Sequence, residues 1–427
     1  MRVSVDVSSI RGELNAPTSK SYTHRAIAIG ALSCECIVRK PLLSADTLAT
    51  VAACEKLGAK IEKIDGDLHI TGMRGKPGVP DDVIDVKNSG TTLRLMTAIS
   101  SIANGATVLT GDSSIRGRPN QPLLDVLNKL NVEAFSTRNN GCAPIVVRGG
   151  LKGSAAEIDG SMSSQFISAL LMACPLAMED TILSVKGELK SRPYVDITIE
   201  MLKEAGVRIL VDETNGIKFI IPANQQYGLK DYTVPGDFSS ASYLFAAAAM
   251  LGSCITVHDL FPSKQGDSEM INVLRQMGAD VQWDTEKGVV TVRGKKLKGI
   301  NFDAGATPDL VPTVAVLAAV ADGVTVIGNA KHVRYKETDR LHAMAVELSK
   351  MGIMVKEEPD SLTITGGKLT GAEVHGWYDH RIVMALTLVA MVAGNTTIDT
   401  ADSVSISYPN FFEDIRSIGA KIEMLDE

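Results

Sequence analysis

The chain has 427 residues, of which 45% are hydrophobic and 22% carry a charge, a composition typical of a globular protein with more than one domain. Its net charge of −7 argues against a nucleic-acid-binding or anionic-membrane-binding surface, so any anion site has to be local. The six cysteines lack metal-site spacing, which favours a reduced protein. The N-terminus lacks the apolar core of a signal peptide, and run 382–393 is too short to span a bilayer. We therefore expect a cytoplasmic protein.

The first distinctive stretch is 15–25, which lies between a strand-like run and an apolar, helix-like run. Pro17 and the hydroxyl side chains after it are typical of a helix start. Lys20 and Arg25 are unusual there, because the first turn of a helix already carries the positive end of its dipole. Cations beside free backbone N–H groups favour a bound anion such as phosphate. For this stretch alone, a surface loop with two solvated cations is the alternative.

A sixfold repeat becomes visible along the chain. At nearly equal intervals, a helix-like segment ends in Gly or Asn and runs into a strand-like alternation. These residues readily adopt the left-handed conformation that ends a helix. The six positions are Gly58, Asn131, Gly206, Gly278, Gly352 and Gly419. Each repeat also has an earlier, Ala-rich helix that is apolar on nearly all sides and is expected to be buried. These helices are predicted at 21–32, 91–103, 165–177, 239–251, 309–321 and 380–393.

The repeat determines the expected domain organisation. Each unit should run strand, buried helix, strand, outer helix, strand, strand. A solenoid is one possibility, but the repeat is long for that class. Two globular domains of three βαβαββ units fit better, one at 18–235 and the other formed by 1–17 with 236–427. The turn-rich stretch 233–237 is suited to a hinge.

Side chains that bind anions or move protons collect at the predicted helix starts. Parallel helices would aim their N-termini at one face of each domain, and two opposed faces would form an anion-attracting cleft that holds the active site. Arg side chains bind phosphate and carboxylate bidentately. Asp309 opens a nearly uncharged helix and is either an N-cap or a general base. Lys336, Glu337 and Arg340 crowd one helix start, as a surface ion-pair ladder or as a catalytic cluster.

The sequence predicts neither a metal nor an organic cofactor. No set of His, Cys and carboxylate side chains has zinc-site spacing, and neither a Walker loop nor a dinucleotide-binding glycine pattern occurs. His24 and His380 each adjoin an Arg, so we interpret them as hydrogen-bonding residues rather than metal ligands.

Seven stretches, in chain order, together resemble the EPSP synthase family of enolpyruvyl transferases. They are 17–25, 88–94, 116–119, 163–166, 191–194, 336–340 and 379–381. The resemblance implies a two-domain inverted α/β barrel, each domain with three βαβαββ units. It also implies transfer of the enolpyruvyl group of phosphoenolpyruvate to the 5-hydroxyl of shikimate 3-phosphate, on the pathway to chorismate and aromatic amino acids. The family implies no cofactor, glyphosate as an inhibitor, and a chain that acts as a monomer.

The resemblance also assigns site residues. The shikimate 3-phosphate contacts would be Lys20, Ser21, Arg25, Ser163, Ser164, Gln165, Ser191, Asp309 and Lys336. The phosphoenolpyruvate contacts would be Lys20, Gly90, Arg118, Gln165, Arg340 and Arg381. Asp309 and Glu337 resemble the proton-transfer pair, and Lys20 is a third catalytic candidate. Which carboxylate handles which proton stays open.

Two positions depart from the family pattern, and a second enolpyruvyl transferase activity is an alternative to the EPSP synthase reaction. Some members have Asn at the position of His332 and Lys at the position of Ile406, so those two substrate contacts are uncertain here. The alternative activity is that of UDP-N-acetylglucosamine 1-carboxyvinyltransferase. That related enzyme typically has a reactive Cys in the loop corresponding to 111–117, which contains none. A non-catalytic anion-binding protein of the same fold is the alternative from another class.

Overall fold

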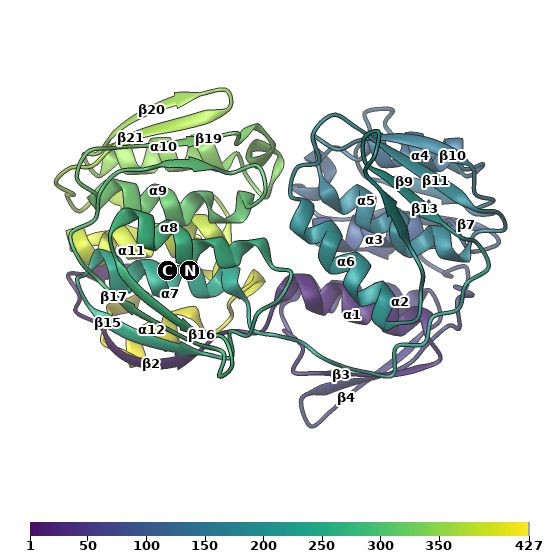
Figure 1. Cartoon of the computed structure of the whole chain (residues 1–427), viewed down its shortest axis with the longest axis horizontal. Coiled ribbons are helices and arrows are strands. Elements are labelled where there is room, and N and C mark those ends of the chain that lie inside the picture. The colour runs from purple at the N-terminus through teal and green to yellow at the C-terminus, as the bar shows by residue number, and fades with distance from the viewer. Residues whose placement is uncertain (426–427) are drawn as a thin grey trace. The chain divides into compact units, whose positions relative to one another are not determined.

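The structure, a computed structural model that describes residues 1–425, comprises two compact units (Figure 1). The N-unit is Lys20–Val234, and the C-unit is Met1–Ser19 together with the chain from Pro235 onward. Six four-stranded sheets are distributed between them. Within each unit the strands lie around the outside and the helices lie between the sheets, which is the inverted α/β arrangement that the sequence predicted.

The N-unit contains the first half of the repeat. Its elements are α1 (Lys20–Leu32), β3 (Glu35–Arg39), α2 (Ala45–Lys56), β4 (Lys60–Ile64), β5 (Asp67–Thr71), β6 (Ile84–Asp85), α3 (Gly90–Ser100), β7 (Ala106–Thr110), α4 (Gln121–Lys129), β8 (Glu133–Ser136), β9 (Ile145–Arg148), β10 (Ala155–Asp159), α5 (Ser164–Ala173), β11 (Thr181–Lys186), α6 (Arg192–Glu204), β12 (Leu210–Asp212), β13 (Lys218–Ile221) and β14 (Asp231–Thr233). Helices α3 and α5 pack against each other, and α1 packs against α2 and α6.

The C-unit contains the second half of the repeat and both chain ends. Its elements are β1 (Arg2–Asp6), β2 (Arg11–Asn15), α7 (Phe238–Met250), β15 (Cys254–His258), α8 (Met270–Met277), β16 (Asp280–Asp284), β17 (Val289–Arg293), β18 (Asn301–Asp303), α9 (Val311–Val320), β19 (Val324–Gly328), α10 (Arg340–Lys350), β20 (Met354–Glu358), β21 (Ser361–Thr365), β22 (Glu373–Val374), α11 (His380–Ala393), β23 (Thr396–Ile398), α12 (Phe411–Ser417) and β24 (Lys421–Leu425). Helices α7, α9 and α11 pack against one another.

All six sheets share one topology, in which the first two strands are parallel and the remaining two add antiparallel. In the sheet β10-β11-β13-β12, Ala155 lies opposite Ile182 in the parallel pair, and Thr181 lies opposite Ile221 in the antiparallel pair. Strand β2 pairs with β15 in the C-unit, and β14 pairs with β3 in the N-unit. Each strand therefore belongs to a βαβαββ unit whose other elements are distant in sequence: those of β2 come after the chain has passed through the N-unit, and those of β14 lie at the start of the N-unit. Strand β1 completes the sheet of β22, β23 and β24.

The predicted helix ends are confirmed. Asn131 has φ 65° and Gly58 has φ 110°, and the other four predicted positions also have positive φ. Nearly every residue of the six Ala-rich helices is buried, as their lack of a polar face required. Three of their predicted bounds differ from the structure by two residues or more. Helix α3 ends at Ser100, three residues earlier than predicted. Helix α5 gives way to a 3-10 turn at Cys174–Leu176, and α9 begins at Val311 after a 3-10 turn at Pro308–Leu310.

Among residues 1–425, no helix combines the length and apolar character needed to cross a membrane. Within the same residues, no group of three or more His, Cys, Asp or Glu side chains is arranged to hold a metal ion.

Candidate active site

The candidate residues of the N-unit lie at the starts of buried helices. Lys20 is the first residue of α1, Gly90 the first of α3 and Ser164 the first of α5. Ser163 caps α5 by accepting a hydrogen bond from the backbone N–H of Gln165 at 3.3 Å. Each start leaves backbone N–H groups without a helical partner, so these positions are suited to anions.

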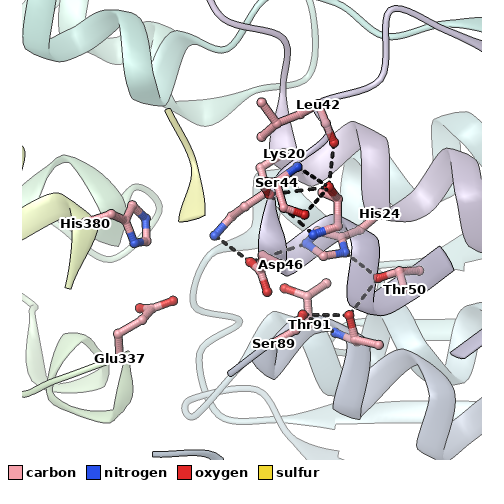
Figure 2. Close-up of polar contacts among 12 residues, drawn as sticks. Lys20, His24, Leu42, Ser44, Asp46, Thr50, Ser89, Thr91, Glu337 and His380 are labelled. Atoms are coloured by element: carbon pink, nitrogen blue, oxygen red, sulfur yellow. Dashed lines mark hydrogen bonds and ion pairs between the residues drawn. The ribbon is translucent and has the colours of Figure 1, made fainter. Parts of the chain in front are cut away.

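The Lys20 ammonium is held by Asp46 from the neighbouring helix α2 (Figure 2). Its Nζ lies 2.9 Å from Oδ2 of Asp46, and both side chains are largely buried. Ser44 and Thr47 form a capping box that begins α2, which puts Asp46 in the first turn, where a carboxylate suits the helix dipole. Burial alone would raise the pKa of Asp46, but Lys20 and His24 lower it well below its usual range.

Arg25 is a buried cation whose hydrogen bonds all go to neutral oxygens. Its Nε donates to Thr198 Oγ1 at 2.8 Å, and its two Nη atoms donate to the carbonyls of Ser21 and Tyr194 at 2.9 and 3.0 Å. Among the described residues, no carboxylate forms an ion pair with it. Burial lowers the pKa of Arg25 to about 10, which still leaves it charged near neutral pH. A buried charge without an opposite charge favours an anionic ligand.

A second group of polar side chains surrounds Gly90. A Cβ added at Gly90 would lie 2.8 Å from Nη1 of Arg118 and 3.7 Å from Nη1 of Arg94. Arg94 also donates to Oε1 of Gln165, whose Nε2 donates to Thr91 Oγ1 at 3.0 Å. Gly90, Arg118 and Gln165, which the resemblance assigned together, therefore lie in one neighbourhood. Arg94 joins them as a residue that the assignment omitted.

In the C-unit, the Asp309 carboxylate lies among three cations. Its Oδ1 accepts from Arg340 Nη1 at 2.9 Å and lies 3.6 Å from Lys336 Nζ. Its Oδ2 accepts from Arg381 Nη2 at 3.0 Å. Asp309 lies in the 3-10 turn before α9, Arg340 and Arg381 come from the starts of α10 and α11, and Lys336 follows the 3-10 turn Lys331–Tyr335. Asp309, Lys336, Arg340 and Arg381, which the family resemblance assigned to the site, therefore lie together in this unit.

Arg340 is almost wholly buried and contacts three carboxylates. Besides Asp309, it donates to Glu337 Oε2 at 2.6 Å and to Asp379 Oδ2 at 2.8 Å. Burial acts to lower the pKa of Arg340, but Asp379 and the other two carboxylates raise it overall. Burial also lowers the pKa of Lys336; Asp309 opposes this effect, and Arg340 adds to it. The ion pairs of this stretch therefore converge on the buried Arg340, with partly buried Asp309 and Glu337 around it, rather than forming an exposed surface ladder.

Some residues of this arrangement were missed by sequence reasoning. Asp379 caps α11, accepting from Arg381 N at 2.9 Å, and also pairs with Arg340. Asp46 pairs with Lys20. In both cases the signal was a carboxylate at a helix start, but its partner depends on how the helices pack. Ser21 and Ser191 lie at the starts of α1 and α6, with Ser191 in the left-handed conformation. His332 and Ile406 are buried in 3-10 turns.

Comparisons with known proteins identify the family of this chain. The family described as EPSP synthase (3-phosphoshikimate 1-carboxyvinyltransferase) matches residues 5–415. The 3-phosphoshikimate 1-carboxyvinyltransferases of Methanosarcina mazei and Methanosarcina acetivorans are each 67% identical to this chain over 429 residues, covering 100% of both sequences. A solved structure of EPSP synthase from Acinetobacter baumannii superposes with a TM-score of 0.83 at 28% identity, covering 100% of each chain. The chain therefore belongs to the EPSP synthase family, the 3-phosphoshikimate 1-carboxyvinyltransferases of the shikimate pathway.

Proposed function

We propose that the polar residues around Lys20 and Gly90 in the N-unit and those around Asp309 in the C-unit act on the same pair of substrates in the EPSP synthase reaction. In this assignment the C-unit supplies proton transfer through Asp309 and Glu337, and both units supply cations for the phosphate and carboxylate groups. The observation that carries the proposal is the Asp309 carboxylate, held between Arg340 and Arg381 with a second carboxylate, Glu337, on the same Arg340.

The chemistry fits these residue types. Addition of the 5-hydroxyl to phosphoenolpyruvate needs a base at the hydroxyl and an acid that protonates the methylene carbon. Elimination of phosphate from the resulting tetrahedral intermediate needs a base that removes a proton from the new methyl group and an acid that protonates the leaving phosphate. Arg118, Arg340 and Arg381 would bind the donor's phosphate and carboxylate and stabilise the leaving phosphate. Arg25 and the N-terminus of α5 would hold the acceptor's phosphate.

The assignment of the acceptor is tested by phosphate release in a coupled assay. The enzyme is supplied with phosphoenolpyruvate and either shikimate 3-phosphate or UDP-N-acetylglucosamine. Turnover is expected only with shikimate 3-phosphate, the acceptor of the family that matches this chain. Turnover with the nucleotide sugar would favour the related transferase, and no turnover with either would favour a non-catalytic anion-binding protein.

Gly90→Ala should weaken glyphosate more than phosphoenolpyruvate. The new methyl group would lie 2.8 Å from Nη1 of Arg118, so the guanidinium has to move. Glyphosate is the longer molecule at its phosphonate end and should tolerate that movement less. One carbon in a fitted pocket is worth about tenfold or more in discrimination. The ratio of Ki for glyphosate to KM for phosphoenolpyruvate, measured on both proteins, should therefore rise. A changed unfolding temperature with an unchanged ratio would mean that Gly90 serves only the helix start.

Anionic ligands should draw the two units together. Each unit carries cations at its helix starts, and such like charges repel until an anion lies between them. Rotation would occur about a few residues near 16–18 and Pro235, where the chain passes between the units. Small-angle scattering should show a smaller radius of gyration with shikimate 3-phosphate plus glyphosate. Shikimate, which lacks the phosphate, is the control and should change it less. A radius that stays constant with the full ligand pair contradicts this expectation.

A further inference from the structure

His24 lies one turn after Lys20 on α1 and is completely buried. Its Nε2 is 3.4 Å from Oδ2 of Asp46, the same oxygen that binds Lys20 Nζ at 2.9 Å. Its Nδ1 is 2.7 Å from the hydroxyl of Thr50 on α2. Figure 2 shows the imidazole between these two side chains of α2. The family resemblance gave His24 no role.

The surroundings of His24 indicate a neutral ring. Burial lowers its pKa below the ordinary value; Asp46 opposes this effect, while Lys20 and Arg25 on the same helix add to it. A neutral imidazole has one N–H and one acceptor nitrogen. Since Nε2 faces a carboxylate, the proton belongs on Nε2, and Nδ1 then accepts from the Thr50 hydroxyl.

This tautomer orients a chain of hydroxyl groups. The Thr50 hydroxyl donates its one hydrogen to His24, so its oxygen accepts a hydrogen bond from Thr92 Oγ1, which is 2.6 Å away on α3. Thr92 in turn accepts from Ser89 Oγ at 2.6 Å. Ser89 is the N-cap of α3, the helix that begins with Gly90. Close polar contacts therefore link Asp46, the partner of Lys20, to the start of α3: the 3.4 Å contact of Nε2, followed by three hydrogen bonds through Thr50, Thr92 and Ser89.

We propose that His24 is a positioning residue for the phosphoenolpyruvate site: it orients Asp46 and, through Asp46, fixes the Lys20 ammonium relative to the start of α3 at Gly90. This inference rests on the proposed function and on the donor contacts of Lys20 and Gly90 that the family resemblance implies. Without His24, the Asp46 carboxylate would lose its contact with the imidazole. Lys20 would then sample positions away from the donor. A misplacement of about 1 Å in such a site can cost about 100-fold in rate.

The test uses two substitutions of His24 in the full-length enzyme. His24→Leu removes both polar contacts, whereas His24→Gln retains an amide N–H that can reach Asp46 as Nε2 does. We expect His24→Leu to raise KM for phosphoenolpyruvate, or lower kcat, by about 10- to 100-fold. KM for shikimate 3-phosphate should rise less, because that substrate shares Lys20 but also has Arg25 and the start of α5. His24→Gln should recover most of the loss. Equal scaling of both KM values, or no recovery with Gln, would overturn the proposal.

A readout that needs no turnover separates this inference from the proposed function. Acetylation of Lys20 by acetic anhydride, followed by mass spectrometry of its peptide, reports how firmly Asp46 holds the amine. The rate should rise severalfold in His24→Leu and stay near wild type in His24→Gln. An unchanged rate in His24→Leu would refute the positioning role even if the enzyme is active. A wild-type enzyme without turnover would refute the proposed function and leave the acetylation comparison intact.

Thr50→Val provides a second route should His24→Leu fail to fold. It keeps the imidazole and removes only the hydroxyl that donates to Nδ1. The matched control is Thr97→Val, because Thr97 is equally buried and its hydroxyl donates to the Leu93 carbonyl of its own helix at 2.7 Å. Thr50→Val should raise the Lys20 acetylation rate and the KM for phosphoenolpyruvate above those of Thr97→Val. Identical values for the two variants would contradict the proposal.

Discussion

Replacing Asp309 with Asn should lower kcat by about 10²- to 10⁴-fold and leave the fold intact. Asn has the same size and can still accept one hydrogen bond from Arg340, which lies 2.9 Å from Oδ1. It cannot take up a proton, and it turns an N–H toward one of the two guanidinium groups. The measurement is phosphate release with both substrates saturating, together with thermal unfolding. A kcat near that of the wild type would remove Asp309 from the mechanism.

Glu337→Gln should lower kcat to a similar extent, because Gln keeps a contact to Arg340 but cannot take up or give a proton as a carboxylate does. The chain offers a matched control two residues away. Asp339 caps α10 by accepting from His342 N at 3.1 Å and pairs with Arg334, outside the cluster around Arg340. Asn caps helices as well as Asp does, so Asp339→Asn should retain nearly full turnover. A similar fall in both variants would mean that Glu337 acts through charge alone.

Much of the fold could be predicted because its constraints are local. A helix that ends in the left-handed conformation needs Gly or Asn, so Asn131 and Gly278 could be identified from the sequence alone. Helices without a polar face have to be buried, which placed the six Ala-rich helices inside. The predicted end of α5, at 177, was too late. The residue before a proline is disfavoured in a helix, so Pro175 indicates that the helix ends earlier.

The candidate site could be predicted less completely, because side-chain partners depend on how helices pack. Lys336, Glu337 and Arg340 are neighbours in sequence, so their grouping was visible from spacing alone. Asp379 pairs with Arg340 across 39 residues, and periodicity does not specify which helix start meets which. The same holds for Asp46, which a serine cap places in the first turn of α2 beside Lys20. How the helices pack determines that these two carboxylates, which lie at helix starts, pair with cations.

Two buried arginines should respond in opposite ways to the same substitution. Arg340 lies among Asp309, Glu337 and Asp379, so Arg340→Met would remove the cation that the fully buried Asp379 carboxylate shares with the two partly buried ones. Removing one member of such a buried group costs about 3–5 kcal/mol of unfolding free energy. The ligand-free Arg340→Met variant should therefore unfold at a clearly lower temperature than the wild type, by calorimetry. A stability equal to that of the wild type would mean that the cluster is solvated rather than buried.

Arg25→Met should weaken acceptor binding without that loss of stability. The partners of Arg25 are neutral and stay satisfied after its removal, because Thr198 Oγ1 also bonds to Ser168 Oγ at 2.8 Å and to the Tyr194 carbonyl at 2.9 Å. A buried cation with no opposite charge costs free energy in the empty enzyme, so a Met of similar length should leave the unfolding temperature unchanged or raise it. Each charge-assisted hydrogen bond to a phosphate is worth about 1.5–3 kcal/mol, so KM for shikimate 3-phosphate should rise about 10- to 100-fold. Calorimetry with and without shikimate 3-phosphate measures both effects, since the ligand's stabilisation should disappear in the variant. A variant that loses stability when empty, yet is still stabilised by shikimate 3-phosphate, would show that Arg25 belongs to the fold and not to the acceptor site.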